Sequence, residues 1–120
     1  MKLRIKGNSI RVSLTKAEVE EIFSGGTFEE STIFGENIFK YELKQSNVAH
    51  ELSAEFFSGR ITIFLPSSLI QDWNSNDTVG FNATTMYGLC ILVEKDFKCL
   101  DETTEDQSDN FENPHTTCQE

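Results

Sequence analysis

The sequence predicts an α+β domain of about eight mainly antiparallel strands and two short helices. Two observations support this prediction. Segments with alternating apolar and polar residues, the pattern of half-buried strands, occur in pairs around two-residue turns that contain glycine. Two short stretches carry apolar residues at helical spacing, and each follows such a pair. The chain of 120 residues suits one hydrophobic core, which we place in a single domain of residues 1–97.

The first hairpin is predicted over residues 2–14. Apolar and polar residues alternate on both sides of Gly7-Asn8, a dipeptide typical of two-residue turns. With this loop, Ile5 lies opposite Ile10, and the next apolar pair falls on the same face. The matching of apolar pairs on one face supports this register.

A helix and two more strands complete the first half of the domain. Thr15 and Glu18 have the spacing of a capping box, in which a hydroxyl and a carboxylate accept hydrogen bonds from N–H groups at a helix start. An apolar stripe at helical spacing follows, and a pair of glycines ends the helix near residue 25. Strands are predicted over 27–34 and 38–44, the second with apolar and charged residues on opposite faces.

The second half of the domain repeats this order. A hairpin is predicted over residues 51–65 with its turn at Ser58-Gly59, and in this register Phe56 lies opposite Ile61 on the apolar face. Pro66, which follows this hairpin, ends the strand and is favourable at a helix start. Trp73 then supplies part of the apolar face of the second short helix.

Two further strands end the domain, over residues 79–84 and 89–93. The second carries apolar residues at successive positions, so we expect it to be covered on both faces and Cys90 to be buried. Residues 98–120 show no periodicity, and residues 101–120 hold seven acidic residues and no Lys or Arg. We therefore predict an acidic, irregular tail after the domain.

The two halves match each other when the chain is shifted by 51 residues, which places Ile10 on Ile61. This match suggests an internal duplication of a strand-strand-helix-strand-strand unit, with halves 1–46 and 51–97, which closes into a barrel. Any two units of hairpin and helix would align comparably well, so chance similarity remains the competing explanation.

Composition excludes several classes of function. The net charge of −10 disfavours general nucleic-acid binding, because neutralising phosphates requires an excess of Lys and Arg. No apolar run is long enough for a membrane helix, and the start of the chain does not resemble a secretory signal. Three cysteines, an odd count, do not suggest a disulfide framework. We therefore expect a cytoplasmic protein that contacts neither membrane nor nucleic acid.

The strongest candidate site is the outer face of the first hairpin. In the predicted register Arg4 lies opposite Arg11, and like charges opposed across paired strands are unfavourable. We predict an anion-binding site formed by the basic side chains on this face: Lys2, Arg4, Lys6 and Arg11. The partner is a small anion or an acidic protein segment, since phosphate and carboxylate suit the forked donors of arginine.

The competing interpretation is that the chain neutralises this face with its own acids. Glu42 and Glu55 on other strands, or the acidic tail, are the candidates. No pattern predicts a catalytic residue, a metal site or a cofactor: calcium-loop spacing, a CxxC zinc knuckle and a phosphate-binding glycine loop are all missing. We therefore favour a non-enzymatic binding or interaction module with a basic, anion-binding sheet face.

Several segments resemble a known group of proteins. They are the opening Met1–Arg11, then Phe64-Leu65-Pro66, Trp73, Leu92–Phe97 and Asn113-Pro114. Together they are similar to a family of small, functionally uncharacterised bacterial proteins, and the resemblance covers nearly the whole chain. Such proteins usually have a proline where this chain has Glu112. Because the family has no established activity, the resemblance implies a lineage and no mechanism.

A second resemblance concerns the fold alone. A duplicated unit that closes into an eight-stranded barrel is similar to the triphosphate tunnel enzymes, whose tunnel binds polyphosphate and whose Glu-x-Glu-x-Lys strand binds metal. The corresponding strand here, Ser9–Ser13, has no carboxylate. The resemblance implies an alternative function, a phosphohydrolase-like barrel acting on an anionic phosphate compound. Lys40, Lys44 and Arg60 would then join the basic residues of the hairpin in one anion site.

Overall fold

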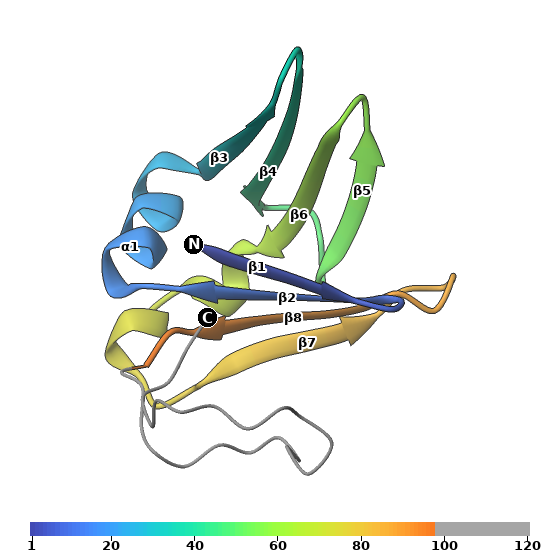
Figure 1. Ribbon diagram of the computed structural model, residues 1–120. Coiled ribbons are helices and arrows are strands. Elements are labelled where there is room, and N and C mark those ends of the chain that lie inside the picture. Colours follow the sequence, from blue (N-terminus) through green and yellow to red (C-terminus); the bar gives the residue numbers. More distant parts are fainter. Residues whose placement is uncertain (98–120) are drawn as a thin grey trace, which may run out of the picture.

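The computed structural model describes residues 1–97, which form two four-stranded sheets and two short helices (Figure 1). The predicted α+β class with eight strands is confirmed. The predicted acidic tail, residues 98–120, lies outside the described residues. The elements, in chain order, are β1 (Lys2–Lys6), β2 (Ser9–Leu14), α1 (Lys16–Gly25), β3 (Thr27–Phe34), β4 (Asn37–Ser46), β5 (Ser53–Phe57), β6 (Arg60–Pro66), α2 (Ser67–Ile70), the 3-10 turn η1 (Trp73–Ser75), β7 (Gly80–Thr84) and β8 (Cys90–Lys95).

Each sheet consists of two hairpins that join through a parallel pair of strands. Sheet A has the order β1-β2-β8-β7, and sheet B has the order β3-β4-β6-β5. The hairpins are antiparallel, but β2 is parallel to β8 and β4 is parallel to β6. The prediction of mainly antiparallel sheets is therefore correct within the hairpins and wrong at the centre of each sheet. Alternation and turn residues define a hairpin locally, whereas the joining of two hairpins depends on long-range packing.

The expected closed barrel is not found among residues 1–97. Sheet A ends at β1 and β7, and sheet B ends at β3 and β5, so each sheet keeps two edges. A barrel would require hydrogen bonds between these edges. Figure 1 shows instead that the sheets lie close at their helical end and diverge toward the hairpin turns.

The two halves of the chain occupy equivalent places in this fold. Exchanging each element for its counterpart in the other half converts the strand order of sheet A into that of sheet B. The central registers differ by one residue: Val12 pairs with Val93, whereas its counterpart Ile63 pairs with Leu43 and not with Glu42, the counterpart of Val93. This arrangement is compatible with the hypothesis of internal duplication, which stays a prediction.

One apolar core lies between the sheets and extends under the helices. The fully buried members contributed by the strands are Val12, Leu14, Leu43, Leu65, Ile91 and Val93. Trp73 closes the helical end: it is completely buried, its ring lies 4.8 Å from that of Phe81, and its Nε1 donates a hydrogen bond to the carbonyl oxygen of Thr78 at 2.8 Å. The core therefore holds sheets and helices together at this end.

Strand β8 corrects one expectation. Ile91 and Val93 are buried against the core, but Cys90 on the opposite face is exposed. The prediction of a doubly covered strand with a buried cysteine is wrong, because among residues 1–97 the core packs on only one face of sheet A. No helix within residues 1–97 is long and apolar enough to cross a membrane.

The N-terminal ammonium group is held by two carboxylates beside α1. It donates to Glu18 Oε2 and, at 3.1 Å, to Glu30 Oε1. Burial disfavours the ammonium, but these two carboxylates raise its pKa above the ordinary value near 8. Burial likewise disfavours the charged form of Glu18, yet the ammonium lowers the pKa of this carboxyl. Glu18 also accepts from the backbone N–H of Thr15 at 2.8 Å, which confirms the predicted capping box.

We expect Glu18→Gln to lower the free energy of unfolding by about 1 kcal/mol near neutral pH, since glutamine keeps the capping box but loses the ion pair. The lowered pKa of Glu18 contributes stability that is lost as pH falls through the folded value. The raised pKa of the ammonium contributes stability that is lost as pH rises through its folded value. The difference between wild type and variant should therefore be largest between about pH 5 and pH 8.

Urea unfolding at several pH values measures this difference. The matched control is Glu21→Gln, because Glu21 is exposed on the same helix. A pH-independent difference, or an equal effect of both substitutions, would contradict the prediction.

Candidate functional site

The predicted register of the first hairpin is confirmed. Arg4 lies directly opposite Arg11, and Lys2 and Lys6 occupy alternate positions of β1 on the same side. This side is the outer face of sheet A, because the alternate residues of β2, which point to the opposite side, are buried in the core: Ile10, Val12 and Leu14. We call Lys2, Arg4, Lys6 and Arg11 the basic face.

Two acids from the end of the domain lie on the basic face. Arg11 Nε donates to Glu94 Oε2 at 2.7 Å, and the same oxygen accepts from Ser13 Oγ at 3.2 Å. Lys2 Nζ lies 3.0 Å from Asp96 Oδ2. Glu94 and Asp96 thus compensate charge on the basic face, at Arg11 and at Lys2.

These acids differ from Glu42 and Glu55, the two strand residues expected to neutralise this face; the acidic tail, the other candidate, lies outside the described residues. Glu42 lies on β4 and Glu55 on β5, both in sheet B, so neither neutralises the basic face. Glu94 reaches Arg11 because β8 lies parallel to β2, with Ser13 opposite Glu94. No local pattern reveals a pairing between strands at opposite ends of the chain, so sequence reasoning missed Glu94.

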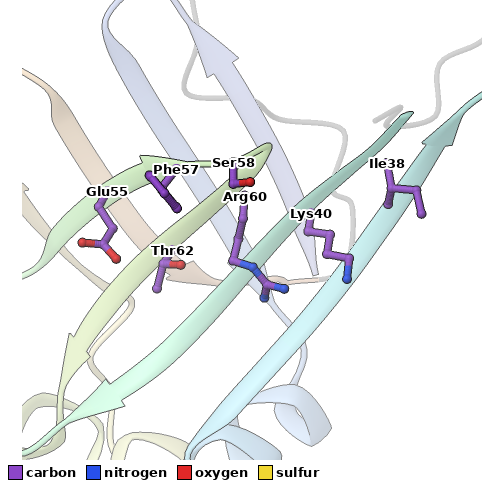
Figure 2. A pocket seen from close by; sticks show the side chains of 7 residues that line it. All are labelled: Ile38, Lys40, Glu55, Phe57, Ser58, Arg60 and Thr62. Carbon is purple, nitrogen blue, oxygen red and sulfur yellow. The ribbon is translucent and has the colours of Figure 1, made fainter. Parts of the chain in front are cut away.

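A pocket of about 300 Å³ opens on the outer face of sheet B (Figure 2). The lining residues come from β4, from β5 and β6, and from the turn between the last two: Ile38, Lys40, Glu55, Phe57, Ser58, Arg60 and Thr62. The registers explain why they gather, since Lys40 lies beside Arg60 and Glu55 lies opposite Thr62. Charged and aromatic side chains therefore share this face of the sheet.

The charge of Arg60 is compensated at the side of this pocket. Arg60 Nη1 forms an ion pair with Glu29 and lies 3.4 Å from Glu42 Oε1. The hydroxyl of Thr62 donates to the same oxygen of Glu42 at 3.2 Å. Figure 2 shows the guanidinium reaching away from Glu55 toward β4. The pocket is therefore a weaker anion site than its two basic side chains suggest.

The single anion site implied by the barrel resemblance is not formed by the described residues. Lys40, Lys44 and Arg60 belong to the outer face of sheet B, whereas the basic face belongs to sheet A. Within residues 1–97, no three side chains of the metal-ligating types gather into a cluster. The geometry consequently offers two separate polar surfaces.

These observations define an α+β protein of two mixed sheets with an exposed basic sheet face. The chain belongs to a family of unknown function, DUF7009, whose family model matches residues 1–115. The predicted membership of a functionally uncharacterised family is thereby confirmed. No curated protein and no solved structure matches the chain.

Proposed function

We propose that the protein is a non-enzymatic binding module whose basic face takes an acidic polypeptide segment. The observation that supports this most is the placement of Arg4 directly opposite Arg11 on an exposed face. Lys2, Arg4 and Lys6 follow one another at every second residue of β1, an edge strand of sheet A. Their spacing of about 7 Å equals that of alternate side chains in an extended peptide, so carboxylates on such a peptide would match them in turn.

The nearest source of such a segment is the chain itself. Residues 101–120 carry seven acids, and the described domain ends at Phe97, directly after Asp96, which pairs with Lys2. We include this acidic tail as an intramolecular occupant that competes with other acidic ligands. Charge complementarity and the place where the domain ends support this assignment.

The alternative function, a phosphohydrolase-like barrel, would be favoured if the basic side chains converged with Glu42 and Glu55. In residues 1–97 the basic face and these two carboxylates lie on different sheets. The geometry therefore favours the binding module.

Titration of the full chain with a synthetic acidic peptide, followed by NMR amide shifts, tests this proposal. We expect binding at low salt that weakens as salt is added, because exposed charges are screened. Arg4→Gln should weaken binding about tenfold, the loss of one charge-assisted contact. Lys44→Gln is the matched control, since it removes a basic residue from sheet B and should leave binding unchanged.

Two further experiments distinguish the possible ligands of the basic face, which are the tail, another acidic peptide and a small anion. Replacing the seven Asp and Glu residues of 101–120 with Asn and Gln gives a neutral-tail variant. This variant should bind the peptide more strongly than the wild type if the tail competes for the basic face. Inorganic phosphate that binds as tightly as the peptide would identify a small anion as the ligand. The proposal would be overturned if neither the acidic peptide nor phosphate changed the NMR amide shifts, in the wild type or in the neutral-tail variant.

A further inference from the structure

Strand β1 forms one edge of sheet A, and part of its backbone is directed away from the sheet. Successive residues of a strand direct their backbone groups to opposite neighbours. The carbonyl oxygen of Leu14 accepts from an N–H directly after β8 at 2.8 Å, so the even-numbered residues of β2 face β8 and Arg11 faces β1. Arg4, opposite Arg11, therefore exchanges hydrogen bonds with β2. Its neighbours Leu3 and Ile5 direct their N–H and C=O groups to the open side.

The open side of β1 lacks a neighbouring strand. Within residues 1–97, the outward backbone groups of Leu3 and Ile5 form no hydrogen bond, and β2 is the one element that β1 contacts extensively. Figure 1 shows β1 at the border of sheet A. An extended peptide adds to a sheet at such an edge, because its backbone supplies the missing hydrogen bonds.

The two faces of β1 determine which peptide fits. Lys2, Arg4 and Lys6 lie on the outer face of sheet A, whereas Leu3 and Ile5 lie on the inner face. Leu3 packs against the core, but Ile5, near the hairpin turn, is 54% exposed. Side chains of paired strands lie opposite one another on one face. On an added strand, acidic residues would therefore complement the outer set, and apolar residues would cover Ile5.

The charge of β1 distinguishes it from the other edges of the two sheets. Of the four edge strands formed by residues 1–97, β1 alone carries Lys or Arg: β3 and β5 carry glutamates, and β7 has no charged residue. Basic side chains on an edge disfavour pairing with a second copy of the same edge. They attract a strand of opposite charge, so this edge is selective for an acidic peptide.

We infer, on the basis of the proposed function, that the ligand of the basic face is an extended peptide that adds to β1 as an antiparallel fifth strand of sheet A. Acidic and apolar residues alternate along this peptide. Antiparallel pairing, the more stable arrangement per residue, places apolar residues of the peptide opposite Leu3 and Ile5, with which they exchange backbone hydrogen bonds.

The acidic tail matches only half of this pattern. Residues 101–110 hold five of its seven acids and no apolar residue. The tail therefore competes through its charge, and a segment of another molecule fits the edge of β1 better.

NMR titration of the full chain with three synthetic peptides tests this inference. The first peptide alternates four glutamates with three valines. The second carries methyl groups on its three valine nitrogens, and the third carries them on three glutamate nitrogens. We expect the second to bind at least tenfold more weakly than the first, because it cannot donate backbone hydrogen bonds to Leu3 and Ile5. The third is the matched control and should bind like the first, since its methyl groups point away from β1.

Amide hydrogen exchange supplies an independent measurement on the protein. With the first peptide at saturation, the amides of Leu3 and Ile5 should exchange at least tenfold more slowly than in the free chain. The amide of Arg4, which already bonds to β2, should change little and serves as the internal control.

Equal binding of the first and second peptides, or unchanged exchange at Leu3 and Ile5, would overturn the inference and leave the proposed function standing, because charge alone would then explain binding. A loss of binding confined to the third peptide would indicate a parallel strand and contradict the antiparallel arrangement. If none of the three peptides bound, the inference and the proposed function would both be wrong.

Discussion

Replacing Trp73 with alanine is expected to lower the free energy of unfolding by about 3–5 kcal/mol, the range for deleting a large buried aromatic side chain. Trp73 is completely buried where the helices close the core. Its removal leaves a cavity beside Phe81, 4.8 Å from the indole ring, and leaves the carbonyl oxygen of Thr78 without its 2.8 Å hydrogen bond. Both losses act in the same direction.

Urea unfolding followed by circular dichroism measures this effect, because Trp73 is the single tryptophan of the chain and its fluorescence is lost in the variant. Trp73→Phe keeps most of the ring but not the N–H donor, so its effect should be smaller. Phe57→Ala, at a side chain that is 80% exposed, should change the stability of the protein by less than about 0.5 kcal/mol. Equal effects of Trp73→Ala and Phe57→Ala would show that the indole does not anchor the core.

Gly80→Ala is expected to destabilise the protein by about 2 kcal/mol, although it adds one methyl group. Gly80 lies opposite Glu94 in the pair of β7 and β8. A Cβ at this position would lie 2.5 Å from the carbonyl oxygen of Val93 and 2.9 Å from Cα of Glu94. Because these atoms belong to the backbone, β7 must move away from β8 to accommodate the methyl group.

Gly25→Ala is the matched control. An added Cβ at Gly25, the last residue of α1, meets no atom within 4 Å. This substitution should leave the stability unchanged or raise it by several tenths of a kcal/mol, because alanine restricts the unfolded chain. Thermal unfolding measures the stability of both variants. Equal unfolding temperatures for Gly80→Ala and Gly25→Ala would contradict the expected clash at Gly80.

The hairpins were predictable because their information is local. Alternation around Gly7-Asn8 and Ser58-Gly59 determines which residues face one another, and the opposition of Arg4 and Arg11 followed from it. The central parallel pairs were not predictable in this way. They join segments from different halves of the chain, and no turn residue indicates which of these segments pair.

Local sequence patterns are likewise informative about the face on which a side chain lies, but not about its exposure. Alternation correctly placed Phe56 opposite Ile61 on one face of the sheet, yet Ile61 is buried and Phe56 is 69% exposed. Alternation reveals the face on which a side chain lies, but not how far the opposing layer extends. The exposure of Phe56 was missed for this reason, since the two sheets diverge toward the hairpin turns.

The parallel pair at the centre of sheet A has a consequence for synthesis on the ribosome. Strand β2 finds its central partner only when β8 has emerged, because Ser9 pairs with Cys90. In sheet B the corresponding pair, Tyr41 with Ile61, joins residues much closer in the chain. Non-local pairing slows folding, so we expect sheet B to form first. Until β8 is synthesised, the apolar face of the first hairpin stays exposed to solvent. This hairpin is therefore the segment of the nascent chain that we expect a chaperone to bind.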